Sequence, residues 1–330
     1  MKKTKVALLY GGPSAEHEVS LNSAKNVMAC LDSNKFEVID IKISKAGVWI
    51  DQTSSKEFSD VEGIKYLKKI QVDLVFIIIH GEYGEDGTIQ KLLESEGIKF
   101  TGSKSEASNL AMDKVASSHV LTDANLNIPS FIFVNKEEWD KDNDKYINAA
   151  KDTFDLPVVV KPTDRGSSVG ISIVKNVVDI KKAVDYGFET SNNVMIQDFI
   201  DGRELTCAVV EGETGKLIPL IPTEITPNSE HTFFDYKAKY APGASIEITP
   251  PNLPKEKIKE IQQSAIIAHE SLDCSHISRS DFILAGDTLY TLEVNTIPGM
   301  TETSLVPQGA KAAGIELSLL LEIIIEAALR

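Results

Sequence analysis

The chain has 330 residues, which suits two domains or one large domain with substantial buried cores. Hydrophobic residues make up 42% and charged residues 25%, the balance of a soluble globular protein. Asp and Glu residues (49) outnumber Lys and Arg residues (34), and the net charge of −15 argues against nucleic acid or an anionic membrane surface as a partner.

The chain starts with a short apolar segment. Its apolar run is too short for a secretory signal, and Gly11 and Gly12 follow at once, so we predict a first β-strand over residues 5–10. The apolar C-terminal stretch is interrupted by glutamates and is too short to cross a bilayer, so we predict a helix packed on the protein. The cysteines form no CxxC pair, which indicates neither a zinc site nor disulfides. We therefore expect a cytoplasmic protein.

Strands and helices alternate in the first third of the chain. The predicted strands cover residues 5–10, 36–43, 72–79 and 98–101. A helix is predicted over residues 20–31. This alternation is typical of a parallel sheet covered on both faces, in which ligands bind beyond the carboxyl ends of the strands. The loop that contains Glu16 and the loop that begins at His80 are therefore candidate site loops.

The middle of the chain contains a candidate phosphate loop. Residues 135–155 are heavily charged with helical stretches, and we predict that they form a solvated face. Strands are predicted over residues 156–161 and 171–174, joined by the small residues of 163–170. Such a loop lets backbone N–H groups approach phosphate oxygens closely, and Lys161 just before it favours this function. It is not a Walker A loop, and a plain hairpin turn is the alternative.

A β-hairpin near the C-terminus carries the strongest chemical signal. Residues 277–284 and 288–294 are predicted strands joined by a turn at Gly286, and a helix is predicted before them over residues 255–272. Folding at this turn places Asp281 opposite or diagonal to Glu293. The side chains expected on the opposite, core face are Phe282, Leu284, Leu292 and Val294.

The other face of the hairpin also carries Arg279 and Asn295. Two carboxylates and an amide oxygen are hard ligands that suit Mg²⁺ with bound phosphate. A solvated face with one salt bridge is the alternative. The turn that follows offers backbone N–H groups near Gly299 that could face an oxyanion, or it is only the exit loop of the hairpin.

Two candidate residues have plain structural explanations as well. Glu16 lies near a helix start, where capping or the helix dipole would explain a carboxylate. His80 follows a buried strand directly, yet a lone histidine in such a position is most often a hydrogen-bonded core residue.

Eight segments of the chain together resemble, in the same order, the D-alanine–D-alanine ligase family of the ATP-grasp superfamily. They are GGPSAEHEVSLNSA, HGEYGEDGT, FTGS with MDK, VVVKPTDRGSSVG, FIDGRELT, FFDYKAKY, RSDF and LEVNTIPGMTETSLVP. The resemblance implies an α/β protein with the ATP-grasp fold. It implies a Rossmann-like parallel-sheet domain over residues 1–111, a small central α+β subdomain over 112–193 and a C-terminal α+β subdomain over 194–330.

The family joins two D-alanines at the expense of ATP, through an acyl phosphate, for peptidoglycan and thus for the cell wall. The resemblance implies two Mg²⁺ ions, with Mn²⁺ as an alternative, held by Asp281, Glu293 and Asn295. It implies contacts to ATP from Lys114, Lys161, Ser167, Ser168, Gln197, Ile200, Glu204, Lys239 and Asn295.

The resemblance also assigns the amino-acid substrates. Glu16 would hold the ammonium of the first D-alanine, and His80 would lie near its carboxylate. Arg279 and the backbone of Gly299 would hold the developing oxyanion. The carboxylate of the second D-alanine would bind at Ser304 and Leu305. A hydrogen-bonded triad that closes the site would consist of Glu16, Ser167 and Tyr240.

Two residues depart from the family pattern, and two other functions stay open. Gln197 stands where an acidic residue is common, and Ser280 stands where an aliphatic residue is usual and points by alternation to the core. A ligase that takes D-serine or D-lactate second is the nearest alternative, although Tyr240 argues against D-lactate. A catalytically silent nucleotide-binding protein is the second alternative function. A homodimer is implied by the resemblance alone.

Overall fold

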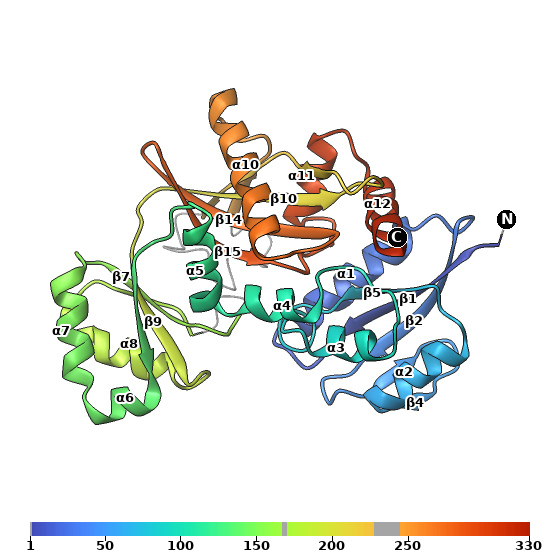
Figure 1. The fold of residues 1–330 in the computed structure, drawn as a ribbon, viewed down its shortest axis with the longest axis horizontal. Helices are drawn as coiled ribbons and strands as arrows, with labels where there is room; N and C mark the ends of the chain where they lie inside the picture. The colour runs from blue at the N-terminus through green and yellow to red at the C-terminus, as the bar shows by residue number, and fades with distance from the viewer. Residues whose placement is uncertain (1, 167–169, 228–244) are drawn as a thin grey trace.

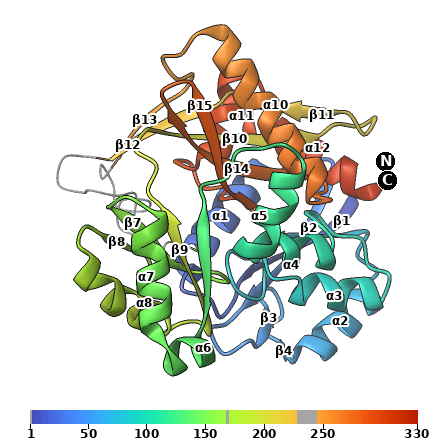
Figure 2. The same cartoon turned by 60° about the vertical axis from the view of Figure 1, so that its left-hand side comes forward.

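The computed structural model describes residues 2–166, 170–227 and 245–330, which form three sheets with their helices (Figure 1). Figures 1 and 2 show the central sheet with α6, α7 and α8 as a lobe of its own, next to the other two sheets. This mixed α/β architecture matches the predicted fold class. No helix in the described ranges is long and apolar enough to cross a membrane.

The first sheet has the strand order β4-β3-β2-β1-β5. Its strands are β1 (Thr4–Gly11), β2 (Phe36–Ile43), β3 (Trp49–Asp51), β4 (Glu57–Phe58) and β5 (Leu74–Ile78). The three long strands are parallel, as predicted, and the two short antiparallel ones extend the edge. The predicted strand over residues 98–101 is wrong, because only Phe100 forms an isolated bridge to Val75. A single bridge gives too little backbone pairing for a strand.

Helices from both ends of the chain cover this sheet. They are α1 (His17–Cys30), α2 (Asp60–Lys69), α3 (Thr88–Ser95) and α12 (Leu317–Leu329), whereas α4 (Ser105–Met112) packs on α5 and β15. Helix α1 begins three residues before the predicted start at residue 20, at a buried His17. The apolar face of α12, with Leu321 and Ile325, is buried in one core with Leu8 of β1 and Phe76 of β5. The predicted packing of the C-terminal helix is therefore confirmed.

The central sheet has the order β6-β9-β7-β8. Its elements are β6 (Phe131–Asn135), α6 (Lys136–Lys141), α7 (Asn143–Thr153), β7 (Val158–Pro162), β8 (Ser172–Val174), a 3₁₀ turn (Val177–Asp179), α8 (Ile180–Gly187) and β9 (Asn193–Asp198). The prediction of a solvated face over residues 135–155 is wrong in part, because Trp139 and Tyr146 are buried in the core of this sheet. Strand β9 also carries the sheet past the predicted boundary at residue 193.

The third sheet has the order β13-β12-β10-β14-β15, with β11 paired to β10. Its elements are β10 (Arg203–Glu211), β11 (Leu217–Pro219), β12 (Thr223–Pro227), β13 (Ser245–Ile248), α10 (Lys255–Ser271), β14 (Ile277–Ala285), β15 (Thr288–Asn295) and α11 (Leu305–Ala312). Helix α5 (Lys114–Asp123) packs here, with Leu121 buried beside Leu272 and Val294. The start of the predicted central part thus shares a core with the C-terminal part.

The hairpin β14–β15 contains a β-bulge. Asp281 pairs with Glu293, but Phe282 pairs with Thr291, so Leu292 is the extra residue. The predicted core positions of Phe282, Leu284 and Val294 are confirmed by their burial. The prediction for Leu292 is wrong, because the bulge interrupts the alternation and leaves Leu292 only partly buried, while Thr291 is fully buried.

Helix α10 contributes a buried histidine to the core of the third sheet. His269 is 2% exposed, and its Nδ1 lies 2.8 Å from Ser278 Oγ on β14. Burial lowers the pKa of His269 to about 4, with the charge of Glu211 opposing this shift. In the unfolded chain the imidazole of His269 therefore binds a proton near pH 6.5, whereas in the folded chain it stays neutral until the pH approaches 4.

This depressed pKa predicts a loss of stability as the pH falls from 6.5 towards 4. At pH 5 the imidazole of His269 should lower the free energy of unfolding by about 2 kcal/mol relative to pH 7. We expect His269→Gln to remove this part of the pH dependence, as measured by urea unfolding at pH 7 and pH 5. His119→Gln, at an exposed position on α5, is the control. Equal pH dependence in wild type and His269→Gln would contradict the prediction.

Candidate functional site

A cavity of about 1060 Å³ lies among α1, the loop after β5, the start of α5, the hairpin β14–β15 and the loop before α11. The predicted site residues that line it are Glu16, His80, Lys114, Glu204, Arg279, Asp281, Glu293, Asn295, Gly299, Ser304 and Leu305. The chain thus brings together residues from positions 16 to 305.

Some predicted residues do not line this cavity. Lys161 on β7 and Gln197 on β9 are buried in the central sheet, where the Gln197 Nε2 lies 3.5 Å from Pro129 O. Ile200 is the second residue after the end of β9. The predicted contacts of Ser167, Ser168, Lys239 and Tyr240 lie outside the described residues.

The two predicted metal-binding carboxylates lie directly opposite each other on the hairpin. Asp281 pairs with Glu293 in the strand register, and Arg279 pairs with Asn295. The Arg279 guanidinium donates two hydrogen bonds to Asp281, from Nε to Oδ1 at 2.8 Å and from Nη2 to Oδ2 at 2.9 Å. Lys114 Nζ lies 3.2 Å from Glu293 Oε2. Cationic side chains thus balance both carboxylates.

The hairpin fits hard cations by its donor chemistry. Asp281, Glu293 and Asn295 present oxygen atoms from neighbouring register positions, which is the kind of donor that Mg²⁺ prefers. Over the described ranges no three His, Cys, Asp or Glu side chains form a metal-binding group. Sites that hold Mg²⁺ with nucleotide phosphates use one or two carboxylates.

Thr206 on β10 was not among the predicted site residues. Its hydroxyl is almost fully buried and lies 2.8 Å from Asp281 Oδ1, where it donates a hydrogen bond. Such a partner fixes the orientation of a metal-binding carboxylate. The residue stands in the segment FIDGRELT, but the sequence contains no sign that β10 and β14 are neighbours.

Lys114 is the first residue of α5, which Asp113 caps by accepting bonds from the N–H groups of Val115 and Ala116. Lys114 is 7% exposed, and its side chain donates to Arg165 O at 2.7 Å besides its contact with Glu293. It therefore joins the predicted phosphate loop to the predicted metal site, and its charge suits a phosphate between them.

Glu16 is the N-cap residue of α1, but its side chain does not cap the helix. It is 8% exposed and lies close to two glycines: a Cβ on Gly81 would come within 3.1 Å of Glu16 Oε2, and one on Gly166 within 3.6 Å. The structural explanation by side-chain capping is therefore wrong, and the carboxylate lies at the wall of the cavity.

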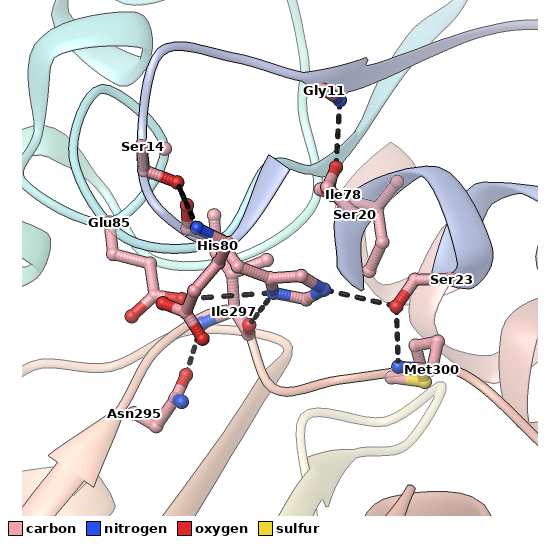
Figure 3. A network of polar contacts seen from close by, with 12 residues as sticks. Gly11, Ser14, Ser20, Ser23, Ile78, His80, Glu85, Asn295, Ile297 and Met300 are labelled. Atoms are coloured by element: carbon pink, nitrogen blue, oxygen red, sulfur yellow. Dashed lines mark hydrogen bonds and ion pairs between the residues drawn. The ribbon is translucent and has the colours of Figure 1, made fainter. Parts of the chain in front are cut away.

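His80 lies at the centre of a buried polar network (Figure 3). Its Nδ1 is 2.8 Å from Ile297 O, and its Nε2 is 3.0 Å from Ser23 Oγ. Glu85, another residue that sequence reasoning missed, has its carboxylate 3.8 Å from Nδ1. Burial lowers the pKa of His80, but the carboxylates of Glu85 and Glu16 outweigh it and raise that pKa above its usual value. For the carboxyl group of Glu85, burial acts in the other direction and raises the pKa.

The loop before α11 places Gly299 against Ser304. A Cβ on Gly299 would come within 2.8 Å of Ser304 Oγ, so any side chain there would have to displace the Ser304 hydroxyl. Ser304 is the N-cap residue of α11, and its Oγ accepts a bond from Thr301 N at 2.9 Å. The N-terminus of α11 therefore faces the cavity and suits a carboxylate.

Comparison with known proteins gives consistent matches along the whole chain. The family model of the D-ala D-ala ligase N-terminus matches residues 5–103, and that of the D-ala D-ala ligase C-terminus matches residues 120–326. The D-alanine–D-alanine ligase of Syntrophobacter fumaroxidans is 40% identical over 99% of this chain and 98% of its own length. That of Leptospira biflexa is 39% identical over 96% of each chain.

Two solved structures are also similar to this chain. The VanG D-Ala:D-Ser ligase from Enterococcus faecalis has a TM-score of 0.87 and 30% identity, over 99% of this chain and 100% of that one. The D-alanine–D-alanine ligase from Bacillus anthracis, complexed with ATP, has a TM-score of 0.81 and 33% identity, over 100% of this chain and 98% of that one.

Proposed function

The chain belongs to the D-alanine–D-alanine ligase family, and from this premise we propose that its cavity joins two D-alanine molecules at the expense of ATP. The dipeptide that forms is the one used for peptidoglycan. The observation that carries the proposal is the hairpin β14–β15, in which two opposed carboxylates lie between Arg279 and Lys114. A site for ATP phosphates and hard cations needs this mixture of charges.

The first step activates the first D-alanine. Glu16 holds its ammonium group, and His80 lies near its carboxylate, which attacks the γ-phosphate of ATP and gives an acyl phosphate and ADP. Lys114 and Lys161 hold the phosphates, together with Ser167, Ser168 and Lys239. Adenine binds along Gln197 to Ile200, and Glu204 takes the ribose hydroxyls. The protein mainly orients the reactants and balances charge.

The second step forms the peptide bond. The amine of the second D-alanine attacks the acyl carbonyl, and phosphate leaves from a tetrahedral intermediate. Arg279 and the Gly299 N–H stabilise the oxyanion of this intermediate. Ser304 and Leu305 at the N-terminus of α11 bind the carboxylate of the second D-alanine. Tyr240 closes the site with Ser167 and Glu16.

Asp281, Glu293 and Asn295 would hold two Mg²⁺ ions, or Mn²⁺ in their place. Bound there, the metal supplies positive charge to the phosphate oxygens during phosphoryl transfer. Arg279 and Lys114, which pair with these carboxylates, add further positive charge beside the same phosphates.

Phosphate release from ATP, measured with and without D-alanine, tests the proposal. We expect release that depends on D-alanine and yields the dipeptide. Product analysis with D-alanine, D-serine and D-lactate as second substrates separates the alternatives, of which D-serine is favoured by the similarity to the Enterococcus enzyme. Nucleotide binding without any D-alanine-dependent release would instead identify a silent nucleotide-binding protein.

We also propose the division into residues 1–111, 112–193 and 194–330, with β9 completing the central sheet across the last boundary, a cytoplasmic location, where ATP is available, and a homodimer. The three cysteines are unpaired, which agrees with a reducing compartment. Light scattering on the purified protein tests the dimer.

A further inference from the structure

Helix α1 binds the backbone of Met300 from two sides. The Met300 N–H donates to Ser23 Oγ at 3.2 Å, and Asn26 Nδ2 donates to Met300 O at 2.7 Å. Ser23 and Asn26 are three residues apart and therefore lie on the same face of the helix. One face of α1 thus holds both hydrogen-bonding groups of a single residue in the loop before α11.

His80 binds the same loop at Ile297, three residues before Met300. A backbone carbonyl only accepts hydrogen bonds, so the Nδ1 of His80 must carry the hydrogen that bonds Ile297 O at 2.8 Å. The Nε2 of His80 in turn contacts Ser23 Oγ at 3.0 Å, which links the two attachments into one chain (Figure 3). Ser23 is 0% exposed and His80 is 3% exposed, so water does not replace a lost contact.

These contacts bracket Gly299. Pro298 has no N–H, and the N–H of Met300 is bonded to Ser23. Among residues 298–300, Gly299 therefore carries the one backbone donor that this turn can present to a ligand. The attachments at Ile297 and Met300 lie on either side of it and restrict where that donor can point.

We propose that Ser23 and Asn26, together with His80, are positioning residues that hold the Gly299 N–H at the reacting carbonyl. The inference rests on the oxyanion function proposed for Gly299. It predicts that Ser23 and Asn26 on α1 control the second step of the reaction through the loop before α11, without touching the atoms that react. Loss of the contact to Met300 should weaken binding of the transition state more than binding of ATP.

A purely structural contact between two parts of the protein is the competing explanation, and Ser20 provides the matched control. Ser20 lies one turn before Ser23 on α1 and is also 0% exposed. Its Oγ accepts a bond from Gly11 N at 2.7 Å and donates to Ile78 O, so it bonds only within the first sheet and its helix (Figure 3). Ser20→Ala therefore removes an equally buried hydroxyl without loosening the loop.

The test compares Ser23→Ala with Ser20→Ala by four measurements: kcat, KM for ATP, melting temperature and affinity for a phosphinate analogue of the dipeptide. The phosphorus of this analogue is tetrahedral, like the reacting carbon in the intermediate. For Ser23→Ala we expect kcat and phosphinate affinity to fall together by about ten- to a hundredfold, with KM for ATP within about twofold. For Ser20→Ala we expect a lower melting temperature, with phosphinate affinity within about twofold of wild type.

Asn26→Asp is the second variant, in case Ser23→Ala does not fold. It keeps the size of the side chain but replaces the donor to Met300 O by an acceptor, and we expect the same split between phosphinate and ATP. Hydrogen exchange of a peptide spanning residues 296–301 reports the attachment independently of activity, and it should accelerate in both variants but not in Ser20→Ala.

The outcomes separate this inference from the proposed function. Variants that lose no more phosphinate affinity than Ser20→Ala, or that lose ATP and phosphinate binding equally, would overturn the inference while the ligase activity of the wild type stands. A wild type without D-alanine-dependent phosphate release would overturn the proposed function. Unchanged hydrogen exchange in the variants would overturn the attachment itself.

Discussion

Glu293→Gln should lower the rate of D-alanine-dependent phosphate release by at least about a hundredfold, with the fold retained. The substitution keeps the size of the side chain but removes one of the two carboxylates that oppose each other on the hairpin. It also removes the charge that pairs with Lys114 Nζ at 3.2 Å. Turnover at moderate Mg²⁺ and the binding of Mn²⁺, followed by electron paramagnetic resonance, are the measurements, and both should be impaired.

Glu211→Gln is the matched control for this prediction. Glu211 lies in the same sheet and pairs with a cation, Arg330, at 2.6 Å, but it does not line the cavity. We expect this control to keep wild-type turnover and Mn²⁺ binding. Near-normal turnover in a folded Glu293→Gln protein would contradict the metal assignment.

Arg279→Ala should lower kcat by about a hundred- to a thousandfold, because it removes one donor to the oxyanion. The guanidinium also holds both oxygens of Asp281, so this carboxylate loses its partner at the same time. KM for ATP should change much less than kcat, since the developing charge is absent from the ground state. Steady-state kinetics at saturating D-alanine measure both quantities.

Arg203→Ala provides the comparison for Arg279→Ala. Arg203 on β10 forms the same two-bond contact with a carboxylate, Glu224, with both distances at 2.6 Å. Its loss removes an equivalent ion pair from the same sheet but no donor to the oxyanion, so we expect kcat within about threefold of wild type. A similar fall in kcat for both variants would mean that Arg279 acts only through the stability of the sheet.

The hairpin illustrates what local sequence predicts. Alternating residues and a turn at Gly286 predicted two strands with Asp281 opposite or diagonal to Glu293, and the register places the two residues opposite each other. The bulge at Leu292 could not be predicted, because alternation assumes that each residue has one partner. The site loops after β1 and β5 were predictable for a similar reason, since parallel strands end at a common edge.

The missed site residues depend on contacts between distant segments. Thr206 orients Asp281 because β10 and β14 are neighbours, and Glu85 matters because its loop folds back onto His80. The stretch over residues 135–155 was predicted to be solvated because charged residues outnumber the others, yet Trp139 is buried there. A few apolar side chains at helical spacing determine such packing, and a high charge content conceals them.

The packing of α12 on the first sheet has a consequence for biosynthesis. Leu320, Leu321, Ile324 and Ile325 complete the core beneath β1 and β5, yet the ribosome makes them long after those strands. During synthesis, the apolar surface of the first sheet that α12 covers therefore stays exposed. This sheet reaches its final packing only when α12 has been made and packs on it. Folding during translation is thus least complete for the sheet that is made first.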